Sequence, residues 1–148
     1  MEDVKRGMEI RNQISVDATL TDITACTKKA ADMFGAKKVA VVGYCWGGTL
    51  AWLAATSLDV AAAVSYYGGL ISKYAAETPR CPVMLHFGKR DAHIPKSEID
   101  AIRQAHPNIP VYLYDAGHGF NCDQRGSYEP ESAALARQRT LDFLKQHL

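Results

Sequence analysis

The sequence predicts a three-layer α/β fold in which helices cover both faces of a parallel sheet. Four apolar segments are rich in valine, alanine and aromatic residues and lack the alternation of a half-exposed strand. Segments with helical periodicity separate them, and a chain of 148 residues fits one domain. Buried strands joined by helices are typical of an αβα sandwich. The strands are predicted at 37–44, 60–69, 81–91 and 109–120.

Helices are predicted in the intervals between these strands. Residues 1–16 are polar and weakly patterned, and we interpret them as a frayed lead-in. A helix is predicted over 17–34, with Gly35 as its stop, and its apolar face consists of Leu20, Ile23, Ala30 and Phe34. Further helices are predicted at 47–57, 96–106 and 130–148. One side of the last helix consists of Leu135, Leu141, Leu144 and Leu148.

The composition excludes several classes of partner. Lys and Arg number 17 and Asp and Glu 16, so the near-zero net charge argues against nucleic acid and anionic membranes. No apolar run approaches the roughly 18–20 residues that span a bilayer. The cysteines lack C-x-x-C spacing, and we expect reduced thiols in a cytoplasmic protein, with Cys26 and Cys81 as packing residues. We expect no metal site, because His118 and Cys122 would supply only two ligands from a loop.

Three chemically competent side chains follow predicted strands. Cys45 follows the first strand, Asp91 the third and His118 the fourth. Active groups of parallel sheets collect at the carboxyl ends of the strands. The order nucleophile, acid, histidine is that of α/β-hydrolases, and Gly43-x-Cys45-x-Gly47 has the form of a nucleophile elbow. The two glycines are expected because a Cβ would clash where strand and helix approach.

These residues predict a cysteine-based catalytic triad. A helix N-terminus and a neighbouring imidazole lower the pKa of a thiol from about 8.5, so Cys45 is the candidate nucleophile. His118 would take the thiol proton, Asp91 would orient the imidazole, and the backbone N–H of Trp46 would donate to an oxyanion. Each residue also has a simpler interpretation. Cys45 can be a small buried hydrophobe, His118 a loop hydrogen-bonding residue and Asp91 a turn cap.

The same stretches resemble the dienelactone hydrolase, or carboxymethylenebutenolidase, family. The similarity extends from about residue 20 and is carried by GYCWGG at 43–48, YYGG at 66–69, GKRDAHIP at 88–95 and GHGF at 117–120. The resemblance implies an α/β-hydrolase whose Cys-His-Asp triad hydrolyses a small lactone or ester through an acyl-thioester. It implies no metal or organic cofactor. The candidates for substrate contact are Trp46, Tyr67, Phe120 and Arg125.

The sequence departs from the family pattern in two places. The family has several strands before the nucleophile strand, whereas residues 1–36 leave room for about one helix. We therefore expect the C-terminal part of the fold without its early strands, which would carry the second oxyanion donor. Cys122 stands where family members that act on dienelactones have a substrate-binding arginine. Replacement cations are sought in Arg125 and in Lys5, Arg6 and Arg11.

The absent strands have a physical consequence for the edge of the sheet. An unpaired apolar strand edge is a site of association, so we expect another chain to cover residues 38–44, by strand pairing or in a homodimer. The leading hypothesis for function is a cysteine-dependent lactone or ester hydrolase. One alternative is a truncated, non-catalytic family member that binds a partner. The other is a redox-responsive protein in which Cys45 is oxidised and Cys122 resolves the product.

Overall fold

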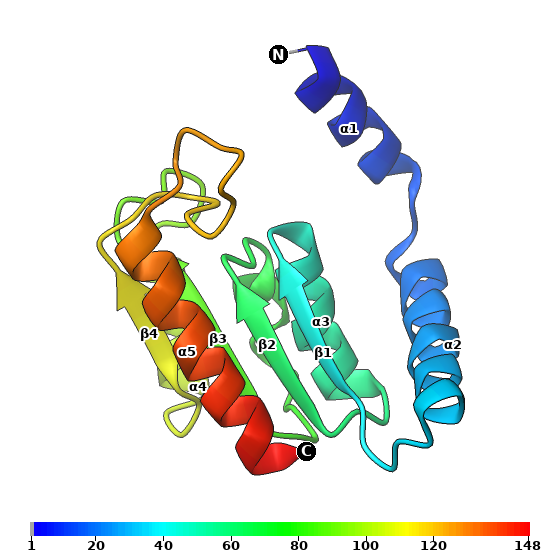
Figure 1. Cartoon of the computed structure of the whole chain (residues 1–148). Coiled ribbons are helices and arrows are strands. Elements are labelled where there is room, and N and C mark those ends of the chain that lie inside the picture. Colours follow the sequence, from blue (N-terminus) through cyan, green and yellow to red (C-terminus); the bar gives the residue numbers. More distant parts are fainter. Residues whose placement is uncertain (1) are drawn as a thin grey trace.

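Four parallel strands form the centre of the structure, a computed structural model that describes residues 2–148 (Figure 1). They are β1 (Ala40–Tyr44), β2 (Ala62–Tyr66), β3 (Val83–Gly88) and β4 (Val111–Tyr114), in the spatial order β1-β2-β3-β4. All three pairings are parallel. Every residue of β2 and β3 is buried, as expected for central strands covered on both faces.

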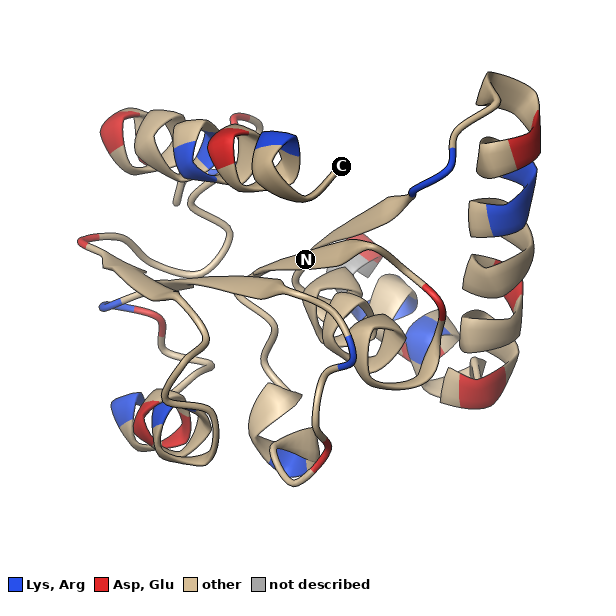
Figure 2. Cartoon of the chain, turned by 90° about the horizontal axis from the view of Figure 1, so that it is seen from below, with Lys and Arg blue, Asp and Glu red and all other residues tan. Residues whose placement is uncertain are grey.

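Helices cover both faces of this sheet. The helices of the described chain are α1 (Glu2–Gln13), α2 (Val16–Phe34), α3 (Trp46–Ser57), α4 (Lys96–Ala105) and α5 (Pro130–His147), with a short 3-10 helix η1 (Ile71–Tyr74). Viewed along the sheet, α3 and α4 lie on one face and α5 on the other (Figure 2). This arrangement confirms the predicted αβα sandwich. Among residues 2–148, no helix combines the length and apolar composition needed to cross a bilayer.

The prediction of a frayed segment at 1–16 is wrong, because Glu2–Gln13 forms α1. This segment is rich in Glu, Lys, Arg and Met, which favour helix even without an apolar face. The break before α2 has a local cause. Ser15 adopts an extended conformation and its Oγ accepts the N–H of Ala18 at 3.0 Å, which caps the next helix.

Of the four leucines predicted to form one side of the last helix, Leu144 packs against the core and the other three are exposed. Leu135, Leu141 and Leu148 are 47, 36 and 54 % exposed. The face of α5 that packs on the sheet instead consists of Ala133, Ala136, Thr140 and Phe143. Small residues let the helix approach the sheet closely, and Thr140 supplies a hydroxyl to polar groups beneath it.

A buried polar network joins α5 to three strands. Thr140 Oγ1 lies 2.6 Å from the hydroxyl of Tyr66 and 3.1 Å from Nε2 of His86. On the other side of the ring, Nδ1 of His86 lies 2.8 Å from the hydroxyl of Tyr114, which also accepts from Arg139 at 3.1 Å. Burial lowers the pKa of His86 to about 3, so the imidazole is neutral in the folded chain.

The neutral state of His86 predicts a loss of stability in mild acid. An unfolded chain protonates this residue below pH 6.5, whereas the folded chain resists until about pH 3. The free energy of unfolding should therefore fall by about 1.4 kcal/mol for each pH unit below 6.5. Urea titrations between pH 6.5 and 4.5 cover this effect. His118, whose pKa is raised, opposes it near pH 6.5, and Glu129, whose pKa is lowered from 4.5, adds to it near pH 4.5, so the contribution of His86 is the difference from a variant that cannot titrate there.

His86→Asn is the matched variant for this measurement, since it keeps a hydrogen-bonding side chain but cannot titrate. We expect its unfolding free energy to depend less on pH over the same window. Equal slopes in the wild type and the variant would show that His86 is protonated in the folded state.

The outer edge of β1 is open. Within residues 2–148, no strand pairs with this edge, and Val42 and Tyr44 are 37 and 46 % exposed. α2 lies beyond the edge and contains no buried residue (Figure 2). Phe34, predicted to face the core, is 79 % exposed. The nucleophile strand thus lies at the border of the sheet, as the sequence predicted.

Candidate active site

Cys45 lies at a sharp turn between β1 and α3. Its backbone has φ 54° and ψ −120°, a left-handed conformation that is costly for a residue with a side chain. The turn is tight, because a Cβ on Gly43 would lie 1.8 Å from the carbonyl oxygen of Gly47. The strained turn directs the thiol away from the sheet and places it at the N-terminus of α3.

The prediction that a side chain at Gly47 would clash is wrong. A Cβ on Gly47 would meet nothing within 4 Å. The second position where a side chain is excluded is Gly48, whose Cβ would lie 2.7 Å from both Ser65 Oγ and the carbonyl oxygen of Tyr66. The helix therefore approaches β2 through Gly48, while Gly47 occupies open space.

The structure brings the three predicted triad residues together from the ends of three strands. Nδ1 of His118 lies 2.7 Å from Oδ2 of Asp91, and Nε2 lies 3.2 Å from Sγ of Cys45. Asp91 is 7 % exposed, whereas the Cys45 side of the site is open to solvent. The imidazole therefore connects a buried carboxylate to an accessible thiol.

The hydrogen bonds of the triad favour charge separation. The hydrogen bonds to Asp91 and Cys45 raise the pKa of His118 to about 9. The pKa of the Cys45 thiol is lowered, chiefly by His118, with smaller contributions from the Trp46 N–H and Arg125. Burial alone would raise the pKa of Asp91, but hydrogen bonds from His118 and the N–H of His93 lower it below 3.8. At neutral pH the site holds an imidazolium next to a thiol that ionises readily.

The contact between His118 and Cys45 predicts that Cys45 titrates below an ordinary thiol. Ultraviolet absorbance of the Cys45 thiolate should persist to lower pH than that of an ordinary thiol, whose pKa is about 8.5. The Cys45 signal is the difference between the wild type and Cys45→Ser. His118→Asn should raise the pKa of Cys45, because it removes the cation. An unchanged titration in that variant would contradict the ion pair.

Two of the predicted substrate contacts border the triad. Trp46 is the first residue of α3 and is partly exposed, and the guanidinium of Arg11 lies 5.5 Å from the centre of its ring. The ring of Tyr67 lies 5.0 Å from that of His118. Tyr67 also has a positive φ, 42°, so both strained residues of the described chain, Cys45 and Tyr67, are at this site.

The other two predicted substrate contacts are Arg125 and Phe120, and they lie in different surroundings. The side chain of Arg125 lies close to Gly119, where its Cδ would be 3.3 Å from an added Cβ, and its charge lowers the pKa of Cys45. Phe120 has no exposed surface and packs against Tyr67 at 5.5 Å. The ring of Phe120 thus packs beneath the surface against Tyr67, and its substrate contact stays a prediction. Lys5 and Arg6 are exposed on α1.

Sequence reasoning missed His93 and misplaced Cys26. The N–H of His93 donates to Oδ1 of Asp91 at 2.8 Å, and its ring lies 5.2 Å from that of His118. An Asp that accepts the N–H two residues later is a common turn, so the spacing in D-A-H was the available signal. Cys26, expected to pack in the core, is exposed, and Cys81 is half-buried.

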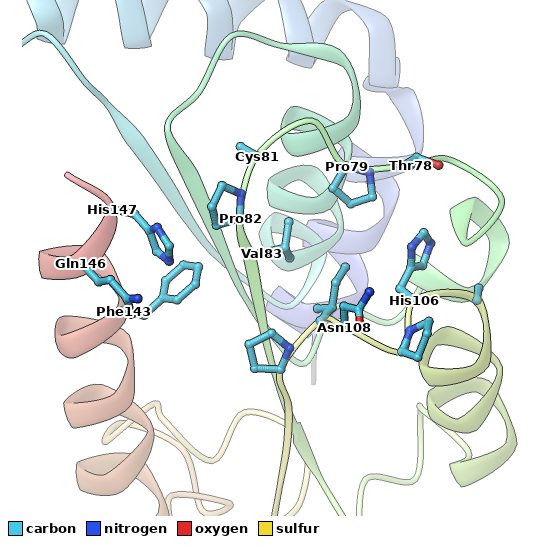
Figure 3. A pocket seen from close by; sticks show the side chains of 14 residues that line it. Thr78, Pro79, Cys81, Pro82, Val83, His106, Asn108, Phe143, Gln146 and His147 are labelled. Atoms are coloured by element: carbon cyan, nitrogen blue, oxygen red, sulfur yellow. The ribbon is translucent and has the colours of Figure 1, made fainter.

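A cavity lies away from the triad, at the amino ends of the strands (Figure 3). It has a volume of about 480 Å³, and its lining includes Pro82 and Val83 at the start of β3, His106 after α4, and Phe143 and His147 on α5. It contains none of the triad residues. Within residues 2–148, no three His, Cys, Asp or Glu side chains are grouped to hold a metal ion.

Comparisons with known proteins reveal related sequences. A carboxymethylenebutenolidase of Pseudomonas putida is 35% identical over 95% of this chain and 62% of its own length. A Yersinia pestis protein assigned as a carboxymethylenebutenolidase is 39% identical over 75% of this chain and 48% of its own. The chain therefore spans between about half and two thirds of these relatives.

Solved structures of hydrolases are also similar to this chain. A Klebsiella pneumoniae protein assigned as a dienelactone hydrolase matches with a TM-score of 0.85 and 30% identity, covering 91% of this chain and 63% of that one. An esterase of Pyrococcus furiosus shares the fold at 15% identity, with a TM-score of 0.72 over 86% of this chain and 62% of its own. The sequence profile of the dienelactone hydrolase family matches residues 2–148. This chain belongs to the dienelactone hydrolase family.

Proposed function

We propose that this chain hydrolyses a small lactone or ester with Cys45 as the nucleophile. The observation that carries the proposal is the aligned triad, in which His118 lies 3.2 Å from the thiol and 2.7 Å from Asp91. Nucleophile and base within hydrogen-bonding reach, with the base oriented by a third group, constitute the arrangement for covalent acyl transfer. Membership of the dienelactone hydrolase family supports an ester or lactone as the substrate.

In the first half of the proposed reaction, the Cys45 thiolate attacks the acyl carbon of the substrate. The carbonyl π-electrons move to oxygen, and the Trp46 N–H donates to the resulting oxyanion. When the tetrahedral intermediate collapses, the C–O bond breaks and the leaving oxygen takes the proton from Nε2 of His118. The product is an acyl-thioester on Cys45; a lactone leaves its hydroxyl attached to the acyl chain.

In the second half, water hydrolyses the thioester. His118, now neutral, takes a proton from the water as it attacks the acyl carbon. The C–S bond then breaks, the thiolate returns and the carboxylic acid is released, so the ion pair of the resting site is restored. Asp91 stabilises the imidazolium in both halves through its 2.7 Å contact with Nδ1.

The substrate is proposed to lie between the thiol and the side chains that border it. Trp46 and Tyr67 offer aromatic surface, and Arg125 places a positive charge near Cys45. An acyl group of modest size with an electron-rich or anionic substituent fits this combination. Esters that differ only in carrying a carboxylate test the contribution of Arg125, because Arg125→Ala should lower their turnover more than that of neutral esters.

Pre-steady-state hydrolysis of p-nitrophenyl acetate by the purified chain tests the function. We expect a burst of p-nitrophenolate close to one equivalent per chain, followed by slower steady turnover, because acylation precedes hydrolysis of the thioester. Absence of both burst and turnover would contradict the hydrolase and favour a non-catalytic, partner-binding protein. Peroxide-dependent modification of Cys45 without ester hydrolysis would favour the redox alternative.

We also propose that another chain covers the open edge of β1. An apolar strand with unpaired backbone groups associates readily, and Val42 and Tyr44 are exposed there. Sedimentation of the wild type should show a dimer or a stable complex, whereas Val42→Lys, which adds a charge to the edge, should shift it toward monomer. A monodisperse wild-type monomer would contradict the proposal.

A further inference from the structure

His93 contacts two residues of the triad, Asp91 and His118, but has no role in the proposed reaction. Its backbone N–H donates to Oδ1 of Asp91 at 2.8 Å, while Oδ2 of the same carboxylate lies 2.7 Å from Nδ1 of His118. One buried carboxylate therefore holds both residues, one through each oxygen. Asp91 fixes the position of the His93 backbone relative to the imidazole of His118.

The imidazole of His118 is enclosed by two rings. The ring of His93 lies 5.2 Å away at an interplanar angle of 82°, an edge-to-face contact. The ring of Tyr67 lies 5.0 Å away at 57°. Aromatic pairs at such distances contribute about 0.5–1.5 kcal/mol beyond burial of their area. Together the two rings restrict rotation of His118 about its side-chain bonds, so that Nε2 stays 3.2 Å from Sγ of Cys45.

The contact of His93 with His118 is not a consequence of core packing. The side chain of His93 is exposed, whereas its neighbour Ile94 is 3 % exposed and anchors the loop. Pro95 then precedes the first turn of α4. The loop is thus held on both sides of His93, at Asp91 and at Ile94, and this rigid support places an otherwise solvent-exposed ring against the catalytic imidazole.

We propose that His93 is a positioning residue that keeps the imidazole of His118 aligned between Asp91 and the thiol of Cys45. This inference rests on the proposed catalytic function of the triad. Catalytic groups need alignment within about 0.5 Å, and side chains packed against them provide it. His93 acts through His118, whose ring it faces, and through the carboxylate of Asp91.

The test compares His93→Ala with His93→Phe. Both variants keep the backbone N–H to Asp91, but only phenylalanine keeps a ring that can pack against His118. We expect His93→Ala to slow acylation of Cys45 by p-nitrophenyl acetate between about twofold and tenfold, as the 0.5–1.5 kcal/mol of an aromatic contact predicts. His93→Phe should stay within about twofold of the wild type, since it retains that contact. Alkylation of Cys45 by iodoacetamide should follow the same order.

A spectroscopic measurement separates this inference from the proposed function. The Nδ1 proton of His118, hydrogen-bonded to Asp91, should give a low-field proton resonance in the wild type and in His93→Phe, and a broadened one in His93→Ala. An unchanged resonance and alkylation rate in His93→Ala would overturn the positioning role, as would equal losses in the alanine and phenylalanine variants. If no variant is acylated but the resonance differs as expected, the hydrolase function fails and the positioning role stands.

Discussion

Replacement of Cys45 by alanine is expected to reduce ester turnover to the background rate and to leave the fold intact. Removing a catalytic nucleophile lowers kcat by a factor on the order of 10³ or more. The thiol is exposed and its side-chain contact is with Nε2 of His118, so its loss removes no core packing. Turnover of p-nitrophenyl acetate and the circular dichroism spectrum together measure the two parts of this prediction.

Cys26→Ala is the matched control for Cys45→Ala. Cys26 is also exposed, but it lies on α2, away from His118 and Asp91. We expect this variant to hydrolyse the ester at the wild-type rate. Residual turnover in Cys45→Ala, or a comparable loss in Cys26→Ala, would mean that Cys45 is not the nucleophile.

Gly43→Ala is expected to have the largest effect on folding. The new Cβ would lie 1.8 Å from the carbonyl oxygen and 2.3 Å from the carbonyl carbon of Gly47, both backbone atoms at the start of α3. Backbone cannot rotate away as a side chain can, so β1 and α3 would have to separate. We expect a loss of more than about 4 kcal/mol, a large part of the stability of a domain of this size. Soluble yield and urea unfolding measure it.

Gly47→Ala provides the control for the same elbow. An added Cβ at Gly47 meets nothing within 4 Å, and the residue lies within α3. Alanine favours helix over glycine by up to about 1 kcal/mol, so this variant should be at least as stable as the wild type. If Gly43→Ala unfolded at the same urea concentration as Gly47→Ala, the close approach of strand and helix would be wrong.

The fold and the triad were accessible from the sequence because both follow from short-range patterns. The continuous apolar segments before Gly43 and around residues 62–66 predict strands that are buried on both faces. This burial is confirmed for β2 and wrong for β1, because β1 lies at the open edge of the sheet. Once the strands are known to be parallel, their carboxyl ends share one edge, and Cys45, Asp91 and His118 must approach each other there.

Other features could not be predicted because they depend on tertiary contacts. The leucines of α5 suggested one buried face, but Thr140 packs inward because it completes the hydrogen bonds of Tyr66 and His86. A glycine motif does not reveal which glycine lies against another strand, and Gly48 rather than Gly47 does so. The position of His93 depends on the turn at Asp91, which the sequence indicates only through a spacing of two residues.

The most direct test of the central claim is the mass of the chain during turnover. Samples mixed with p-nitrophenyl acetate, quenched in acid within the burst and digested should show one acetyl group, carried by the peptide that contains Cys45. The adduct should be absent from Cys45→Ala and should accumulate less in His118→Asn, because the cation that lowers the thiol pKa is gone. Rapid turnover with unmodified Cys45, or with the acetyl group on another residue, would contradict a cysteine-dependent hydrolase.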